Sequence, residues 1–155
     1  MQLRHENIAI VILAAGLGTR MKSQKAKVLH EVCGRPMILY VVETAAKVAG
    51  DHVILVVGHQ AQRVREVVTE CAKVRYTLQE QQLGTGHAVA SALPDVPVDC
   101  RHVVILCGDV PLVTESTIGN LITDHLTHRR DITVLATEVE DPDGYGRIVI
   151  DTAGR

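Results

Sequence analysis

The chain has 155 residues, of which 46% are hydrophobic and 22% charged, and its formal net charge at pH 7 is -2. This length favours one domain with a core of its own, and the near-neutral charge argues against a nucleic-acid partner. The chain contains three Tyr and neither Trp nor Phe, so it also lacks the aromatic side chains that stack on single-stranded bases. A small ligand is the expected partner.

A basic segment follows the first predicted element, a strand over residues 8–13 whose apolar, β-branched residues indicate burial on both faces. The strand breaks into small residues that include Gly16 and Gly18. Four cations follow, with no acid between Glu6 and Glu31: Arg20, Lys22, Lys25 and Lys27. Glycine lets a ligand approach backbone N–H groups, and the cations favour an anion, so a nucleotide phosphate chain is expected. A loop of merely solvated cations is the less favoured alternative, because no acid offsets their charge.

Two common phosphate-binding loops do not fit this segment. A P-loop needs a Gly-Lys pair, which the chain lacks. A dinucleotide fingerprint needs a third glycine where Met21 stands, and an acid after the second strand, where the sequence is Val57-Gly58-His59. A dehydrogenase is therefore the weakest function considered. A loop that holds a triphosphate and stabilises a pyrophosphate leaving group fits better.

The rest of the chain alternates between predicted helices and strands. The strands cover residues 52–57, 74–78, 102–107, 132–139 and 147–151, and the helices cover the stretch between Pro36 and Gly50, residues 60–72, residues 88–93 and a segment that starts at Thr114. This alternation predicts an α/β fold, a Rossmann-like, mostly parallel sheet with helices on both faces. The last strand runs into a Gly-bearing turn without a returning strand, so a domain that is incomplete at its C-terminus is expected.

Polar residues stand where predicted strands end, at the edge where such sheets bind ligands. Asp109 follows the strand over 102–107, and a carboxylate there is suited to Mg²⁺. The Gly-Asp-x-Pro sequence is also typical of an ordinary turn, and only the neighbouring basic loop favours the metal. Gln79 and the stretch from Leu83 to Gly86 offer an amide and exposed backbone for reading a base edge, although a simple strand–helix turn explains them equally well.

Cysteine and histidine spacing indicates neither a zinc site nor a disulfide framework, because the four cysteines form no C-x-x-C pair. The polar start of the chain does not have the apolar region of a signal peptide, and no apolar stretch reaches membrane-spanning length. A cytoplasmic protein with reduced thiols and no membrane partner is expected.

Four motifs in order then carry a resemblance. Leu13-Ala-Ala-Gly-Leu-Gly-Thr-Arg-Met21, followed by Lys27-Val-Leu-His30, resembles the signature of sugar-1-phosphate nucleotidyltransferases. The other three are Gln82-Leu-Gly-Thr-Gly-His-Ala88, Gly108-Asp-Val-Pro-Leu112 and Asp141-Pro-Asp-Gly-Tyr-Gly-Arg-Ile148. Together they resemble the uridylyltransferase domain of the bacterial bifunctional (GlmU-like) N-acetylglucosamine-1-phosphate uridylyltransferase / glucosamine-1-phosphate acetyltransferase family. The match covers nearly the whole chain, so residues 1–155 are assigned to one nucleotidyltransferase domain.

The resemblance implies a reaction and a set of roles. UMP would pass from UTP to N-acetylglucosamine 1-phosphate, giving UDP-N-acetylglucosamine and pyrophosphate, with Mg²⁺ as cofactor. Arg20 and Lys27 would be catalytic by neutralising the phosphates, and Asp109 would bind the metal. The nucleotide would contact Leu13, Ala14, Ala15, Gly16, Gln79, Gly84 and Thr85, and the sugar substrate would contact Cys107, Gly108 and Gly146.

This sequence departs from the family pattern in three ways. Ala26 replaces a usual Pro, Cys107 replaces a frequent Tyr, and the family's domain continues beyond Arg155 to a second metal ligand, an Asn. The acetyltransferase domain, which forms the family's trimer, would also lie beyond this chain. A nucleotidyltransferase of other base or sugar specificity, and a non-catalytic nucleotide-binding module, remain as alternatives.

Overall fold

A four-stranded parallel sheet with the order β5-β4-β1-β6 organises the chain. The computed structural model describes residues 7–18, 21–141 and 143–150. The sheet strands are β1 (Ile8–Ala14), β4 (Val53–Val57), β5 (Arg75–Leu78) and β6 (His102–Cys107). Every residue of β4 is buried, as a strand covered on both faces requires. The chain divides into two units, residues 1–119 and 120–155, and each is described by itself.

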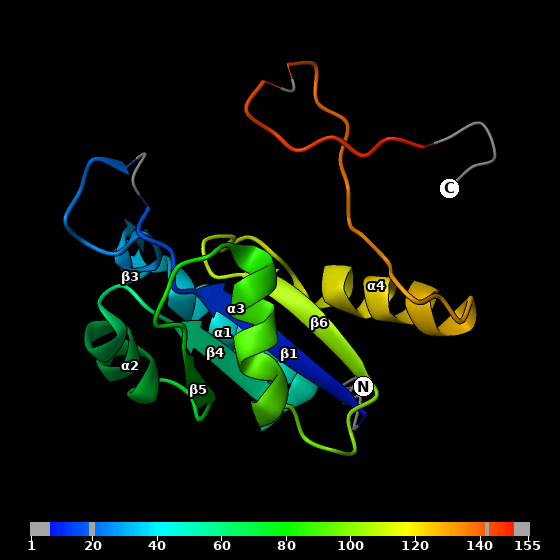
Figure 1. Cartoon of the computed structure of the whole chain (residues 1–155), viewed down its shortest axis with the longest axis horizontal. Coiled ribbons are helices and arrows are strands. Elements are labelled where there is room, and N and C mark those ends of the chain that lie inside the picture. The colour runs from blue at the N-terminus through cyan, green and yellow to red at the C-terminus, as the bar shows by residue number, and fades with distance from the viewer. Residues whose placement is uncertain (1–6, 19–20, 142, 151–155) are drawn as a thin grey trace. The chain divides into compact units, whose positions relative to one another are not determined.

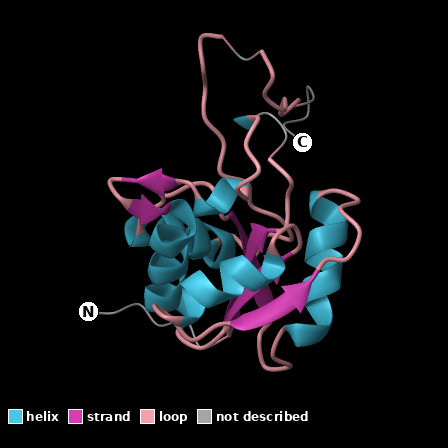
Figure 2. Cartoon of the chain, turned by 90° about the vertical axis from the view of Figure 1, so that its left-hand side faces the viewer, coloured by secondary structure: helices cyan, strands magenta, loops and turns pink. Residues whose placement is uncertain are grey.

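Helices cover both faces of the sheet (Figures 1 and 2). The α-helices are α1 (Met37–Ala49), α2 (Ala61–Thr69), α3 (Thr85–Ala92) and α4 (Glu115–Thr127), and the short 3₁₀ helices are η2 (Lys27–Leu29) and η3 (Leu93–Asp95). On one face, α3 packs small side chains against β1 and β4 in a cluster of Ala9, Val11, Ala15, Ile54, Val56, Ala88 and Ala92. On the other face lies α1, whose apolar stripe includes Ile38, Val41, Val42 and Ala45. The predicted α/β class is confirmed.

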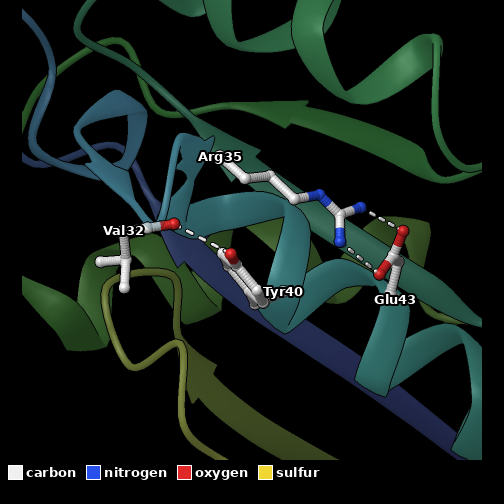
Figure 3. Close-up of polar contacts among 4 residues, drawn as sticks. All are labelled: Val32, Arg35, Tyr40 and Glu43. Carbon is white, nitrogen blue, oxygen red and sulfur yellow. Dashed lines mark hydrogen bonds and ion pairs between the residues drawn. The ribbon is translucent and has the colours of Figure 1, made fainter.

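A short hairpin precedes α1. Strands β2 (Glu31–Val32) and β3 (Arg35–Pro36) pair antiparallel around Cys33 and Gly34. Both turn residues have positive φ, 52° and 76°, as a two-residue hairpin turn requires. Side-chain contacts join the hairpin to α1 (Figure 3): the Tyr40 hydroxyl donates to the Val32 carbonyl at 2.9 Å, and Arg35 pairs with Glu43 through both terminal guanidinium nitrogens.

Glu43→Gln should lower the free energy of unfolding at pH 7 by about 0.2–1 kcal/mol, the usual value of a half-exposed ion pair. The hydrogen bond from Arg35 and its charge lower the pKa of Glu43 against the opposing effect of burial. A lowered pKa stabilises the fold above the unfolded-state pKa, and this stability is lost as the pH falls through the folded-state pKa. Urea unfolding should therefore separate the variant from wild type at neutral pH and not in acid. Glu66→Gln, a glutamate whose recorded contact is with Gln62, is the matched control; an equal loss there would contradict the assignment.

The predicted strands and helices of residues 8–107 are confirmed with shifts at their ends. Strand β6 has the predicted bounds, whereas α2 stops at Thr69, before the predicted Ala72. Helix α3 begins at Thr85 rather than Ala88, because the Gly84 carbonyl already accepts the Ala88 N–H at 3.1 Å. Glycines inside the first turn concealed this start.

The strands predicted at 132–139 and 147–151 are wrong for the described residues. Residues 132–139 and 147–150 have no strand assignment and no strand partner there, and their large apolar side chains are exposed, Ile132 at 78% and Val149 at 84%. Asp151 lies outside the described residues. Alternating or apolar sequence makes a segment able to form a strand, but the strand forms only when its N–H and C=O groups find a ladder.

The second unit contains most of α4 and the histidines at helical spacing. His128 lies 3.1 Å from an Asp124 carboxylate oxygen, and His125 Nδ1 lies 2.9 Å from the Thr133 hydroxyl. Both contacts lie at the end of α4 or in the segment that follows it. Among the described residues, no helix is long and apolar enough to cross a membrane.

Candidate functional site

The carboxyl edge of the sheet carries the predicted site, at the point where the strand order reverses. From β1 the chain proceeds to β4 and β5 on one side, and β6 lies on the other side of β1. In open α/β sheets a crevice forms at such a switch point, beyond the carboxyl ends of the strands. The loops that follow β1 and β6 therefore flank the expected ligand position.

An ion pair between Lys27 and Asp109 joins these two loops. Lys27 lies in η2, where its neighbours Ala26 and Val28 are buried and so direct the lysine side chain toward the edge. Asp109 follows β6, and the adjacent Gly108 N–H donates to the Leu13 carbonyl at 2.9 Å. The side chains of Lys27 and Asp109 are 41% and 28% exposed, so solvent and a ligand can reach both.

The loop after β1 is less strongly cationic in the fold than in the sequence. Lys25 lies 3.4 Å from Glu31, and Lys27 is paired with Asp109, whereas Lys22 is exposed. The two acids that pair with these lysines are Glu31, in β2, and Asp109, after β6. Both lie outside the acid-free stretch of sequence, which therefore did not reveal the pairing. Arg20, predicted as catalytic, lies outside the described residues.

Gln60 holds this loop in place and was not identified from the sequence. Its Oε1 accepts the Ala26 N–H at 3.0 Å, and its Nε2 donates to the Gln24 carbonyl at 2.6 Å. The backbone of Gln60 is left-handed, with φ 53° and ψ 36°, and it forms the N-cap of α2. The sequence signal available for Gln60 is its position just after Gly58, at the end of β4. Its partners stand more than thirty residues earlier, so the sequence does not reveal them.

Gln60→Ala should accelerate hydrogen exchange of the Ala26 amide roughly fivefold, because a hydrogen bond of about 1 kcal/mol would be lost. Exchange followed by NMR measures this directly. Gln62→Ala, which removes an exposed amide in α2 that bonds only within the helix to Glu66, is the control. Equal acceleration in both variants would mean that Gln60 acts through α2 stability rather than through the loop.

Gly18 approaches the lysine of the ion pair closely. It has φ +62°, and a Cβ built on it would lie 2.8 Å from the Lys27 Cβ. Its carbonyl also accepts the Met21 N–H at 2.9 Å. Glycine at this position therefore allows the loop to fold back beside Lys27, whereas the sequence predicted close approach of a ligand.

The residues predicted to contact the nucleotide lie along the same edge. Ala14 and Ala15 are buried and Leu13 is half-buried, so these three offer backbone rather than side chain, and Gly16 is exposed. Gln79 is 3% exposed; its Nε2 donates to the Gly84 carbonyl at 3.2 Å and lies 2.9 Å from His87 Nδ1. Gly84 and Thr85 are exposed at the start of α3. In this arrangement the Gln79 amide holds the exposed turn before α3, a contact that the sequence did not predict.

The predicted substrate contacts divide between the two units. Cys107 and Gly108 close β6 beside Asp109, whereas Gly146 is an exposed residue of the second unit. Burial, reinforced by the charge of Asp109 and opposed by that of Lys27, raises the pKa of the Cys107 thiol. At neutral pH this cysteine is therefore protonated and adds no negative charge beside Asp109.

Comparison with known proteins gives the family. Residues 10–148 match the MobA-like NTP transferase domain. A protein of Thermoanaerobacter pseudethanolicus named "Bifunctional protein GlmU" is 48% identical over 149 residues, which are 96% of this chain and 32% of the relative. A second of that name, from Desulfotalea psychrophila, is 46% identical over 98% of this chain and 45% of its own length. The chain thus spans a third to just under half of these relatives.

The fold is also that of a solved nucleotidyl transferase from Methanothermobacter thermautotroptrophicus. The two superpose with a TM-score of 0.67 at 22% identity, over 77% of this chain and 58% of the other. The ion pair at the switch point and the backbone edge of β1 thus occur on a nucleotidyltransferase fold, and the chain belongs to the MobA-like NTP transferase domain family.

Proposed function

We propose that this chain provides the nucleotide half of a uridylyltransferase site, which transfers UMP from UTP to N-acetylglucosamine 1-phosphate and releases pyrophosphate. The observation that carries the proposal is the Lys27–Asp109 pair, a cation and a carboxylate that meet at the strand switch point beside exposed backbone. The similarity to proteins named GlmU supports the choice of substrates. The Gln82–Ala88 motif, which begins α3 in the fold, supports uracil as the base.

Each described residue then has a task that its position allows. The backbone from Leu13 to Gly16 would receive the nucleotide, since its exposed end carries no side chain that blocks approach. Lys27 would exchange its carboxylate partner for a phosphate oxygen and so offset charge on the pyrophosphate leaving group. A sugar phosphate oxygen would attack the α-phosphorus in line with that leaving group, so positioning and charge suffice without a protein nucleophile.

Asp109 fits the magnesium ion that the family resemblance implies. A partly exposed carboxylate at a strand end supplies a hard oxygen ligand, and Mg²⁺ commonly uses one or two carboxylates with substrate phosphates and water. Bound there, the ion would add positive charge at the phosphate oxygens. Lys27 already neutralises this carboxylate, so the two cations would compete for Asp109 until a phosphate engages the lysine.

Calorimetric titration of the chain with UTP, CTP, dTTP, GTP and ATP, each with Mg²⁺, tests the proposal. Selective binding of UTP is expected. Selective binding of another nucleotide would change the proposed base specificity and leave the proposed reaction class unchanged. If none of the five nucleotides bound, the proposal that this chain provides a nucleotide half-site would be overturned. Pyrophosphate release with N-acetylglucosamine 1-phosphate then separates transfer from nucleotide binding alone.

A further inference from the structure

Three potential metal ligands meet at the amino edge of the sheet, the edge opposite the Lys27–Asp109 pair. His52 immediately precedes β4, and Asp99 and Cys100 lie just before β6. Strands β4 and β6 flank β1 and run parallel to it, so their amino ends lie at one edge. The cluster is therefore separated from the proposed nucleotide site by the length of the strands.

Backbone hydrogen bonds hold the two chain segments that carry the cluster, one at His52 and the other at Cys100. The His52 carbonyl accepts the Ile10 N–H of β1 at 2.9 Å, and the Cys100 N–H donates to the Pro97 carbonyl at 3.0 Å. The next residue, Arg101, donates its N–H to the Asn7 carbonyl at 2.9 Å. The central strand thus holds the backbone of His52 directly, and Cys100 precedes a residue that bonds to Asn7, just before that strand.

The geometry suits a small cation with mixed ligands. Cys100 Sγ lies 3.4 Å from His52 Nδ1, and the ligand atoms of all three residues lie within 4.8 Å of one another. Ligands at zinc distances in a tetrahedral site stand roughly 3.5 Å apart. The histidine–cysteine pair already has this spacing, and the carboxylate of the exposed Asp99 lies within 4.8 Å of both ligand atoms.

We propose that His52, Asp99 and Cys100 form a binding site for a zinc-class divalent cation. Thiolate, imidazole and carboxylate are the three ligand types that Zn²⁺ takes in proteins, and the sulfur ligand disfavours Mg²⁺ and Ca²⁺. With three protein ligands the fourth position is left to water. The spacing of the chain concealed the site, because His52 and Cys100 stand 48 positions apart and meet only when β4 and β6 enter one sheet.

Titration of the reduced chain with Co²⁺, and then with Zn²⁺, tests the site. One equivalent of Co²⁺ should bind with a thiolate-to-cobalt absorption band, and Zn²⁺ should displace it. Cys100→Ser should abolish the band and weaken Zn²⁺ binding by more than about tenfold, and His52→Gln should weaken it similarly. Cys33→Ser, which alters an exposed thiol elsewhere, is the matched control and should change nothing.

The unfolding midpoints of the metal-free variants show whether a loss of metal binding is caused by loss of the fold. If Cys100→Ser is destabilised, His52→Gln, which keeps the thiol, decides alone. Absence of the cobalt–thiolate band in the wild-type chain would overturn the proposal. So would a band that survives Cys100→Ser, or one that Cys33→Ser removes.

Discussion

Lys27→Met is expected to weaken UTP binding by about 10- to 150-fold, the equivalent of the 1.5–3 kcal/mol typical of a hydrogen bond to a charged group. The ammonium lies at the switch point between the loops after β1 and β6, where the phosphates would enter. Methionine keeps an unbranched apolar side chain of nearly the same length and removes the charged ammonium group. Stability should fall by no more than about 1 kcal/mol, because the ion pair with Asp109 is partly exposed.

Lys25→Met is the matched control for this experiment. Lys25 belongs to the same loop and is similarly exposed, but its ion-pair partner is Glu31 rather than a residue of the switch point. Calorimetry with UTP should show a change below about twofold, since removing a more distant surface charge is worth little. Equal losses in the two variants would mean that the loop attracts phosphate only by its overall charge.

Asp109→Asn gives the complementary result. In metal-free buffer the variant should bind UTP at least as tightly as wild type, because the carboxylate repels phosphate and occupies Lys27. The additional affinity that Mg²⁺ confers on the wild-type chain should be missing from the variant. A variant that responds to Mg²⁺ as wild type does would remove Asp109 from the metal site.

How far the sequence predicts this molecule depends on the range of the interaction that decides each feature. Strand β6 and helix α1 were predicted almost to the residue, because an apolar run and a Pro-to-Gly interval are local signals. The hairpin at Cys33 and Gly34 was not predicted, because its strands have two residues each and show no periodicity. The strands predicted over 132–139 and 147–151 do not form within the described residues, for the opposite reason: the sequence pattern is present, but these segments have no strand partner there.

The same distinction holds for the site. Lys27 is predicted from the basic stretch around it, whereas Asp109, which follows a strand end, is predicted as a metal ligand only because that basic loop is expected nearby. Their direct pairing, like the pairing of Gln60 with Gln24 and Ala26, joins distant parts of the chain, and no local pattern encodes it. Such contacts depend on the arrangement of β1, β4 and β6 in one sheet.

Gly58→Ala should lower the free energy of unfolding by about 1–3 kcal/mol, the usual cost of an added methyl group in a close-packed position. A Cβ on Gly58 would lie 2.8 Å from the Ala15 carbonyl oxygen and 2.9 Å from the Ala15 Cβ. That oxygen accepts the His59 N–H at 3.2 Å, so the backbone cannot yield without loosening the junction of β1 and β4. Gly58 does not have positive φ, and the cost is therefore one of contact rather than of backbone conformation.

Gly16→Ala, one residue beyond Ala15, should give the reverse pattern. Apart from its two chain neighbours, no atom of the described residues lies within 4 Å of a Cβ on Gly16, so stability should change by less than about 0.5 kcal/mol. The methyl group would instead stand where the nucleotide is proposed to approach the backbone, and UTP affinity should fall roughly tenfold, about 1.4 kcal/mol. Urea unfolding measures the stability of the two variants, and calorimetry measures their affinity for UTP. The two measurements together distinguish a glycine needed for packing from one needed for binding. If Gly16→Ala bound UTP as well as wild type, the ligand would not lie against this backbone, and Lys27 would have to be explained by another approach.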